Sequence, residues 1–144
     1  MNTKPSNMMA KTRYRNTDLD LISAMSLDGL IHEIEGAGMI LLGSHKDTES
    51  NLHANFEILS EDEKLYADAQ ATIVAMLTIL DNLSAASKKI WEGCHLRELN
   101  VAYDTREEPI AFNEGFSVET LTRMSALNMS FRVTMYPKEQ RKPS

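Results

Sequence analysis

The pattern of apolar and polar positions predicts five strands along the chain. Residues 18–21 read Asp-Leu-Asp-Leu, and residues 52–59 repeat the same period of two, which is typical of a strand with one buried face. The apolar run at 39–42 is a short strand, and the polar residues 43–51 after it predict a hairpin. Leu99, Val101 and Tyr103 form one face of a further strand, and residues 129–136 are the last, ended by Pro137.

Apolar residues at helical spacing fill the segments between these strands. Ser26 is the expected N-cap of a first helix, which ends at Gly36 or Gly38. Residues 60–63 read Ser-Glu-Asp-Glu, a capping box, and open an apolar stripe that reaches residue 91. A continuous helix of roughly 30 residues would be about 45 Å long, so a break near residues 82–84 is expected. Ser117 caps a last helix, which Asn128 can end in the left-handed conformation.

The order of these elements predicts an α+β domain. A β-α-β-β-α-β series with an added α-β unit indicates a split β-α-β (ferredoxin-like) sheet, antiparallel or mixed, with helices packed on one face. We expect a mobile basic tail at 1–16, a single domain at 17–137 and a basic C-terminal tail at 138–144.

Charge is the most informative feature of the composition. The chain has a formal net charge of −6, but residues 16–137 hold 20 Asp/Glu against 8 Lys/Arg. Such a surface repels nucleic acid and anionic membranes and attracts basic partners. No apolar run approaches the roughly 18 residues of a membrane span, and the N-terminus does not read as a secretory signal. A single cysteine, Cys94, precludes an intramolecular disulfide and fits the cytoplasm.

No constellation of side chains predicts a cofactor or metal. His45, Asp47 and His53 are spaced H-x-D-x5-H, which matches no established ligand set. Cys94 and His95 are neighbours, so on a strand they point to opposite faces. The alternative to a non-enzymatic protein is a small metal-assisted or cysteine-dependent hydrolase, in which the fold would bring His45, His53 and Cys94 into one site.

The acidic segment 104–116 is the predicted partner-binding loop, because it places apolar anchors within an acidic rim. Its alternative interpretation is an ordinary connection whose apolar residues tuck under the sheet. The residues predicted to bind a partner are Asp104, Glu107, Glu108, Ile110, Phe112 and Glu114.

The C-terminal third resembles a small bacterial α+β family of unknown function. The similar positions are Trp91-x-Gly93-Cys94, Tyr103-Asp104, Pro109-x-x-Phe112, the Ser117 helix and Tyr136-Pro137. The resemblance implies a bacterial, cytoplasmic protein and a fold, and assigns no catalytic residue.

These features together favour a non-enzymatic protein-binding domain. The specific hypothesis is an immunity or inhibitor protein that neutralises a basic toxin such as a nuclease, since an acidic body competes for a cleft that holds phosphate. A homo-oligomeric structural module, with the long Met-rich helix as the dimer face, is a further alternative.

Overall fold

The computed structural model describes residues 11–137, so residues 1–10 and the predicted C-terminal tail lie outside the described residues. Within this range the chain forms five strands and five helices. In chain order these are β1 (Arg13–Ser23), α2 (Asp28–Ala37), β2 (Met39–Lys46), β3 (Leu52–Ile58), α3 (Glu63–Ala67), α4 (Ala69–Asp81), α5 (Ala85–Glu92), β4 (Leu96–Asp104), α6 (Val118–Ala126) and β5 (Ser130–Tyr136).

The strands form one open sheet in the order β2-β3-β1-β4-β5. β1 is antiparallel to both β3 and β4, and β2 is antiparallel to β3. Only the pair of β4 and β5 is parallel among the described strands, and α6 connects them. β3 therefore separates β1 from β2, which run in the same direction. The predicted α+β class is confirmed, with a mixed and mostly antiparallel sheet.

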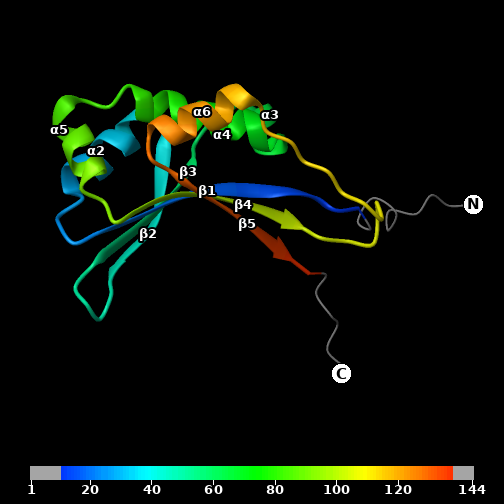
Figure 1. Cartoon of the computed structure of the whole chain (residues 1–144), viewed down its shortest axis with the longest axis horizontal. Helices are drawn as coiled ribbons and strands as arrows, with labels where there is room; N and C mark the ends of the chain where they lie inside the picture. The colour runs from blue at the N-terminus through cyan, green and yellow to red at the C-terminus, as the bar shows by residue number, and fades with distance from the viewer. Residues whose placement is uncertain (1–10, 138–144) are drawn as a thin grey trace, which may run out of the picture.

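The described helices cover a single face of the sheet, as Figure 1 shows. The core lies between the two layers, and the period of two in β1 sets it up: Thr17, Leu19 and Leu21 are buried there. Phe56 of β3 and Ile73 of α4 are completely enclosed in the same layer. No helix of residues 11–137 covers the opposite face of the sheet (Figure 1), where polar side chains range from exposed to nearly enclosed.

The long apolar stripe is three helices rather than one. The expected break near residues 82–84 is confirmed, since α4 and α5 meet there at a bend of 114°. No single helix of the part described is long and apolar enough to cross a membrane, and only this bent pair passes by length and composition. The helix expected to supply a dimer face is therefore not continuous, and many of its apolar residues lie in the core.

Two of the predicted helix starts were wrong by one or two residues. Ser60 does not cap α3, because its Oγ accepts from Asp62 N at 3.0 Å, and the Asp62 carboxylate caps the helix by accepting from Lys64 N at 3.0 Å. Ser26 likewise bonds Asp28 N from the position before the N-cap, Leu27. Ser117 is confirmed as the cap of α6.

Of the two glycines expected to end the first helix, Gly38 does so with φ of 123°, whereas Gly36 lies inside α2. Asn128 takes the expected left-handed conformation after α6, with φ of 54°. The first strand, however, begins four residues before Thr17. Arg13 and Arg15 therefore belong to the sheet rather than to a tail, because β1 pairs with β4 as far as Arg13↔Asp104. The described residues 11–137 hold 20 Asp/Glu against 11 Lys/Arg, a net charge of −9.

Candidate functional site

The face of the sheet that no described helix covers (Figure 1) is rich in polar side chains, and we call it the open face. Strand alternation directs Asp18 and Asp20 of β1 to it, because Leu19 and Leu21 point into the core. The open face also carries four other acidic or amide side chains from the flanking strands β3 and β4: Asn55, Glu57, Glu98 and Asn100. Three strands thus place carboxylates side by side on one surface.

Asp18 is the most perturbed carboxyl group of the open face. Burial raises its pKa to about 7, and the negative charge of Glu57 adds to this shift. Glu57 itself accepts a hydrogen bond, because Asn16 Nδ2 donates to its Oε2 at 2.9 Å. Oδ1 of Asp18 is enclosed and has no hydrogen-bond partner among the residues described. A cationic group brought to this point would stabilise the ionised form of Asp18.

A second acidic cluster lies between β1, β4 and β5. Glu98 is only 6% exposed, and Arg132 Nε donates to its Oε1 at 2.7 Å. Burial raises the pKa of Asp20, and the charge of Glu98 raises it further, whereas Arg132 acts in the opposite direction. Two carboxylates thus share a single arginine, and this part of the open face remains negative.

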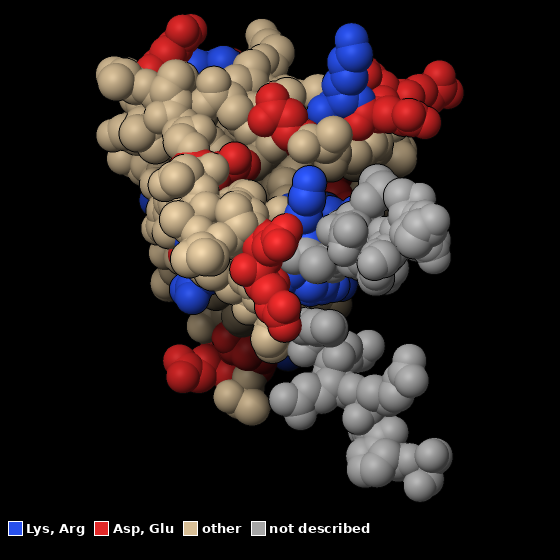
Figure 2. Space-filling view, turned by 90° about the vertical axis from the view of Figure 1, so that its right-hand side faces the viewer, with Lys and Arg blue, Asp and Glu red and all other residues tan. Residues whose placement is uncertain are grey.

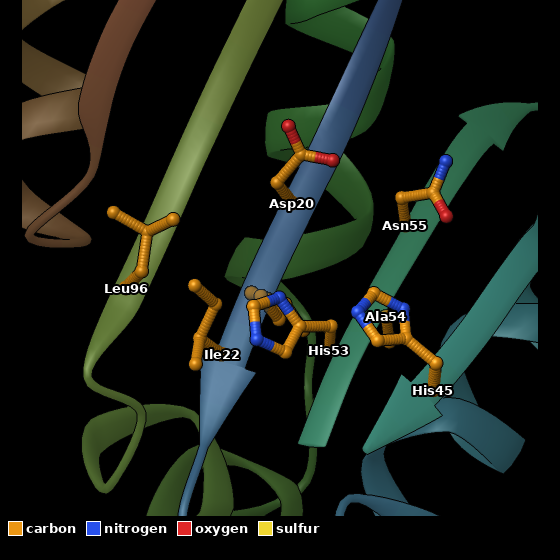
Figure 3. Close-up of a pocket in the computed structure, with 8 residues that line it drawn as sticks. Asp20, Ile22, His45, His53, Ala54, Asn55 and Leu96 are labelled. Atoms are coloured by element: carbon orange, nitrogen blue, oxygen red, sulfur yellow. The ribbon is translucent and has the colours of Figure 1, made fainter. Parts of the chain in front are cut away.

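A shallow groove of about 310 Å³ crosses the same face at the other end of the strands. Figure 3 shows it between β4 and β2, with Asp20 and Ile22 of β1 on its floor and Leu96 on one wall. The imidazole rings of His45 and His53 form the other wall, stacked at 4.5 Å between centroids. The groove is apolar on one side and polar on the other.

The fold brings His45, Asp47 and His53 together, but as a hairpin contact. His53 Nε2 lies 2.9 Å from Asp47 Oδ2, and this bond, together with backbone N–H donors, lowers the pKa of Asp47 to about 2. The other oxygen of Asp47 accepts from the backbone of Glu49 and Asn51, so the carboxylate shapes the turn. Residues 11–137 contain no group of three His, Cys, Asp or Glu side chains arranged to hold a metal ion.

Cys94 and His95 do not form a catalytic pair in this fold. Cys94 is buried, its Sγ lies 3.5 Å from the carbonyl oxygen of Ile90, and burial raises the pKa of its thiol. His95 is exposed, and its backbone N–H donates to Ile22. A thiol with a raised pKa holds little of the nucleophilic thiolate at neutral pH, so this geometry offers the hydrolase alternative no support.

The predicted binding loop is partly a packing element. Phe112 is half-buried, with its ring edge-on to Tyr103 at 5.3 Å, and Tyr103 Oη donates to Glu114 at 3.1 Å. Burial raises the pKa of that tyrosine, and the Glu114 carboxylate raises it further. Asp104 ends β4 and pairs with Arg15 at 3.4 Å. The alternative in which apolar loop residues tuck against the domain thus holds for Phe112.

The remaining three predicted residues are available at the surface. Glu107 and Glu108 are exposed, and Ile110 is fully exposed at 103%. Within residues 11–137, the hydrogen bond of this group is made by the backbone of Glu108, whose carbonyl accepts from Thr12 N at 2.7 Å. Figure 2 views the end of the molecule where this loop lies and shows acidic groups in several separate places with Lys and Arg between them.

Comparison with family models, with curated proteins and with solved structures found no match for this chain. The residues of the open face were not singled out from the sequence as a site. The signal was present, because the alternation that buries Leu19 and Leu21 directs Asp18 and Asp20 outward. The sequence did not indicate that Glu57 and Glu98 would flank them, since strand order decides that.

Proposed function

We propose that this chain is a non-enzymatic protein-binding domain that neutralises a basic protein, as an immunity or inhibitor protein does for a nuclease toxin. The observation that carries the proposal is the helix-free sheet face with Asp18, Asp20, Glu57 and Glu98. We also assign the first four strands to a ferredoxin-like arrangement extended by α6 and β5, and the protein to the bacterial cytoplasm.

The electrostatics of the open face favour a cationic partner. The charge of Glu57 raises the free energy of ionised Asp18, and a lysine or arginine brought beside them would offset that repulsion. Because the pKa of Asp18 is about 7, binding of a cation near pH 7 releases a proton. Affinity for a basic partner should therefore increase as the pH rises from about 6 to about 8.

The loop extends the proposed surface beyond the sheet. Asp104 belongs to both the sheet and the loop, because it is the last residue of β4 and the first residue of the predicted binding loop. Beyond it, Glu107 and Glu108 supply exposed charge and Ile110 supplies an apolar contact. An acidic rim with an apolar anchor is the usual composition of a surface that attracts a basic protein quickly and then holds it.

The test measures binding kinetics against the protein encoded by the neighbouring gene, at low and high salt. The comparison is made at about pH 8, where Asp18, with a pKa of about 7, is mostly ionised. There Asp18→Asn/Asp20→Asn removes close to two charges from the open face, and Glu61→Gln/Glu63→Gln removes two from exposed positions at or just before α3. The change in net charge is then similar, so a larger loss of affinity in the first variant identifies the open face. Equal losses would assign the effect to net charge alone, and no binding by any basic protein would refute the proposal.

A further inference from the structure

The two edges of the sheet differ in how they resist pairing with another strand. On β2 the register shifts between Leu41 and Gly43, and Lys46 ends the strand, both of which are ordinary protections of an edge. β5 has no register shift, and its one charged residue, Arg132, is paired with Glu98 of β4. Its pairing with β4 runs without a shift from Ser130 to Tyr136, and the strand contains no glycine, proline or acidic residue. The outer backbone groups of β5 thus form a regular edge that pairs with no other strand of residues 11–137.

The surface beside this edge is apolar. Phe131, Val133 and Met135 alternate on the helix side of β5 and remain 39%, 47% and 57% exposed. On α6, the ion pair of Arg123 with Asp81 marks the flank that faces α4. Val118 and Leu121 lie on the other flank of the helix. These two residues are 80% and 48% exposed.

The charge of this region favours a second copy of the same chain. Residues 115–136 hold two arginines and one glutamate, a net of +1, within a described body of −9. Arg132 is already paired with Glu98. Two copies that meet at this nearly neutral region therefore face less charge repulsion than two copies that meet at the acidic remainder of the described surface.

We propose that β5 pairs antiparallel with β5 of a second copy, about a two-fold axis at Val133, to form one continuous sheet. This register places Val133 opposite its own counterpart, Phe131 opposite Met135 and Arg132 opposite Thr134. All three apolar residues of β5 then meet apolar residues, and no like charges face each other across the strands. An axis at Arg132 would instead oppose two cations.

The available area is sufficient for such a contact. If a fully exposed large side chain offers roughly 150–200 Å², the exposed side chains of β5 and α6 together contribute on the order of 500 Å² per copy. A specific interface buries about 1,000 Å² or more in total. The surface is separate from the open face, so this inference goes beyond the proposed function and does not depend on it.

Sedimentation equilibrium of the full chain across a range of concentrations tests the proposal. The expected mass is twice 16.2 kDa. Val133→Asp places two carboxylates opposite each other and should raise the dimer dissociation constant by about tenfold or more. Leu42→Asp on β2, at a similar exposure of 49%, is the matched control and should leave the dimer intact.

A crosslinking experiment keeps the proposal testable if Val133→Asp fails to fold. Under mild oxidation Val133→Cys should form a covalent dimer, whereas Leu42→Cys should not, and the native Cys94 is buried and does not interfere. A monomeric wild-type chain, a dimer indifferent to Val133→Asp, or equal crosslinking at both edges would overturn the proposal. A monomer that binds an extended segment of another protein at β5 would also overturn it.

Discussion

Arg132 and Glu98 form the closest ion pair among the described residues, with Arg132 Nε 2.7 Å from Glu98 Oε1. The carboxylate is almost enclosed, at 8% side-chain exposure, whereas the arginine is 59% exposed. The pair joins β5 to β4, which is the only strand that contacts β5 in the described sheet. The last strand therefore supplies the counter-charge for an acid buried beside the centre of the sheet.

Replacing Arg132 with Met should destabilise the domain, because it leaves the carboxylate of Glu98 enclosed without its donor. The loss should be modest, because the arginine is largely exposed and solvent screens its charge. Urea unfolding measures the change. The double variant Arg132→Met/Glu98→Gln should recover part of the loss, and no recovery would show that the arginine acts through packing alone.

Asp18 should make the domain less stable as the pH rises. Its folded-state pKa of about 7 exceeds the ordinary value of roughly 3.9, so the folded state binds more protons than the unfolded state between these values. The free energy of unfolding then falls from about pH 4 to about pH 7. At pH 8 the free energy of unfolding of Asp18→Asn should exceed that of wild type by roughly 1–2 kcal/mol, a figure already reduced for solvent screening. Near pH 4 the two free energies should be equal.

Asp47 provides the control of opposite sign for this pH profile. Its pKa is lowered to about 2, mainly by the bond to His53, so its stabilisation is complete above about pH 4 and is lost as the pH falls toward 2. Asp47→Asn should therefore be less stable than wild type at neutral pH and converge with it in acid. Thermal melts of both variants between pH 2 and pH 8 test the two signs. Parallel curves for Asp18→Asn and wild type would contradict the assignment.

Gly38 and Gly36 offer a matched pair of glycine substitutions. Gly38 ends α2 with φ of 123°, and a Cβ there would lie 3.6 Å from Ile79 Cδ1, which is an ordinary contact. The cost of Gly38→Ala is therefore backbone strain, about 1–3 kcal/mol. Gly36→Ala, inside the helix with nothing within 4 Å, should instead stabilise by about 0.5–1 kcal/mol. Equal effects in chemical denaturation would refute the distinction.

Local patterns predicted the elements well because each depends on neighbours in sequence. The alternation around Leu19 and the cap at Ser117 both hold in the structure. The cap at Ser60 did not, because three acidic residues follow it and Asp62 competes successfully for the role. Choices between adjacent capping residues depend on small energies that the pattern alone does not resolve.

The candidate surfaces were less predictable because they depend on strand order. Glu57 and Asp18 are 39 positions apart, and nothing local brings them together. The same holds for the exposed apolar edge, since Val133 reads as an ordinary core position of a strand. Val133 is exposed because β5 lies at the edge of the sheet, where the helices that cover the other strands do not reach (Figure 1).

In the loop between β4 and α6, an exposed and a packed apolar residue should respond differently to substitution. Ile110→Ser should leave stability within about 0.5 kcal/mol of wild type, because the side chain is fully exposed. Phe112→Ala should destabilise by about 1–3 kcal/mol, because it removes the contact with Tyr103. Thermal and urea unfolding distinguish the two, and similar losses would mean that Ile110 also packs.

The same loop should control binding to a basic partner in two ways. Glu107→Lys/Glu108→Lys reverses exposed charge and should slow association and weaken its salt dependence, whereas Ile110→Ser should speed dissociation. Glu61→Lys/Glu63→Lys changes net charge by the same amount at α3 and serves as the control. If the control slows association equally, the loop acts only through the field of the whole molecule. If neither rate responds to Glu107, Glu108 or Ile110, the loop lies outside the interface, and the open face alone carries the binding proposal.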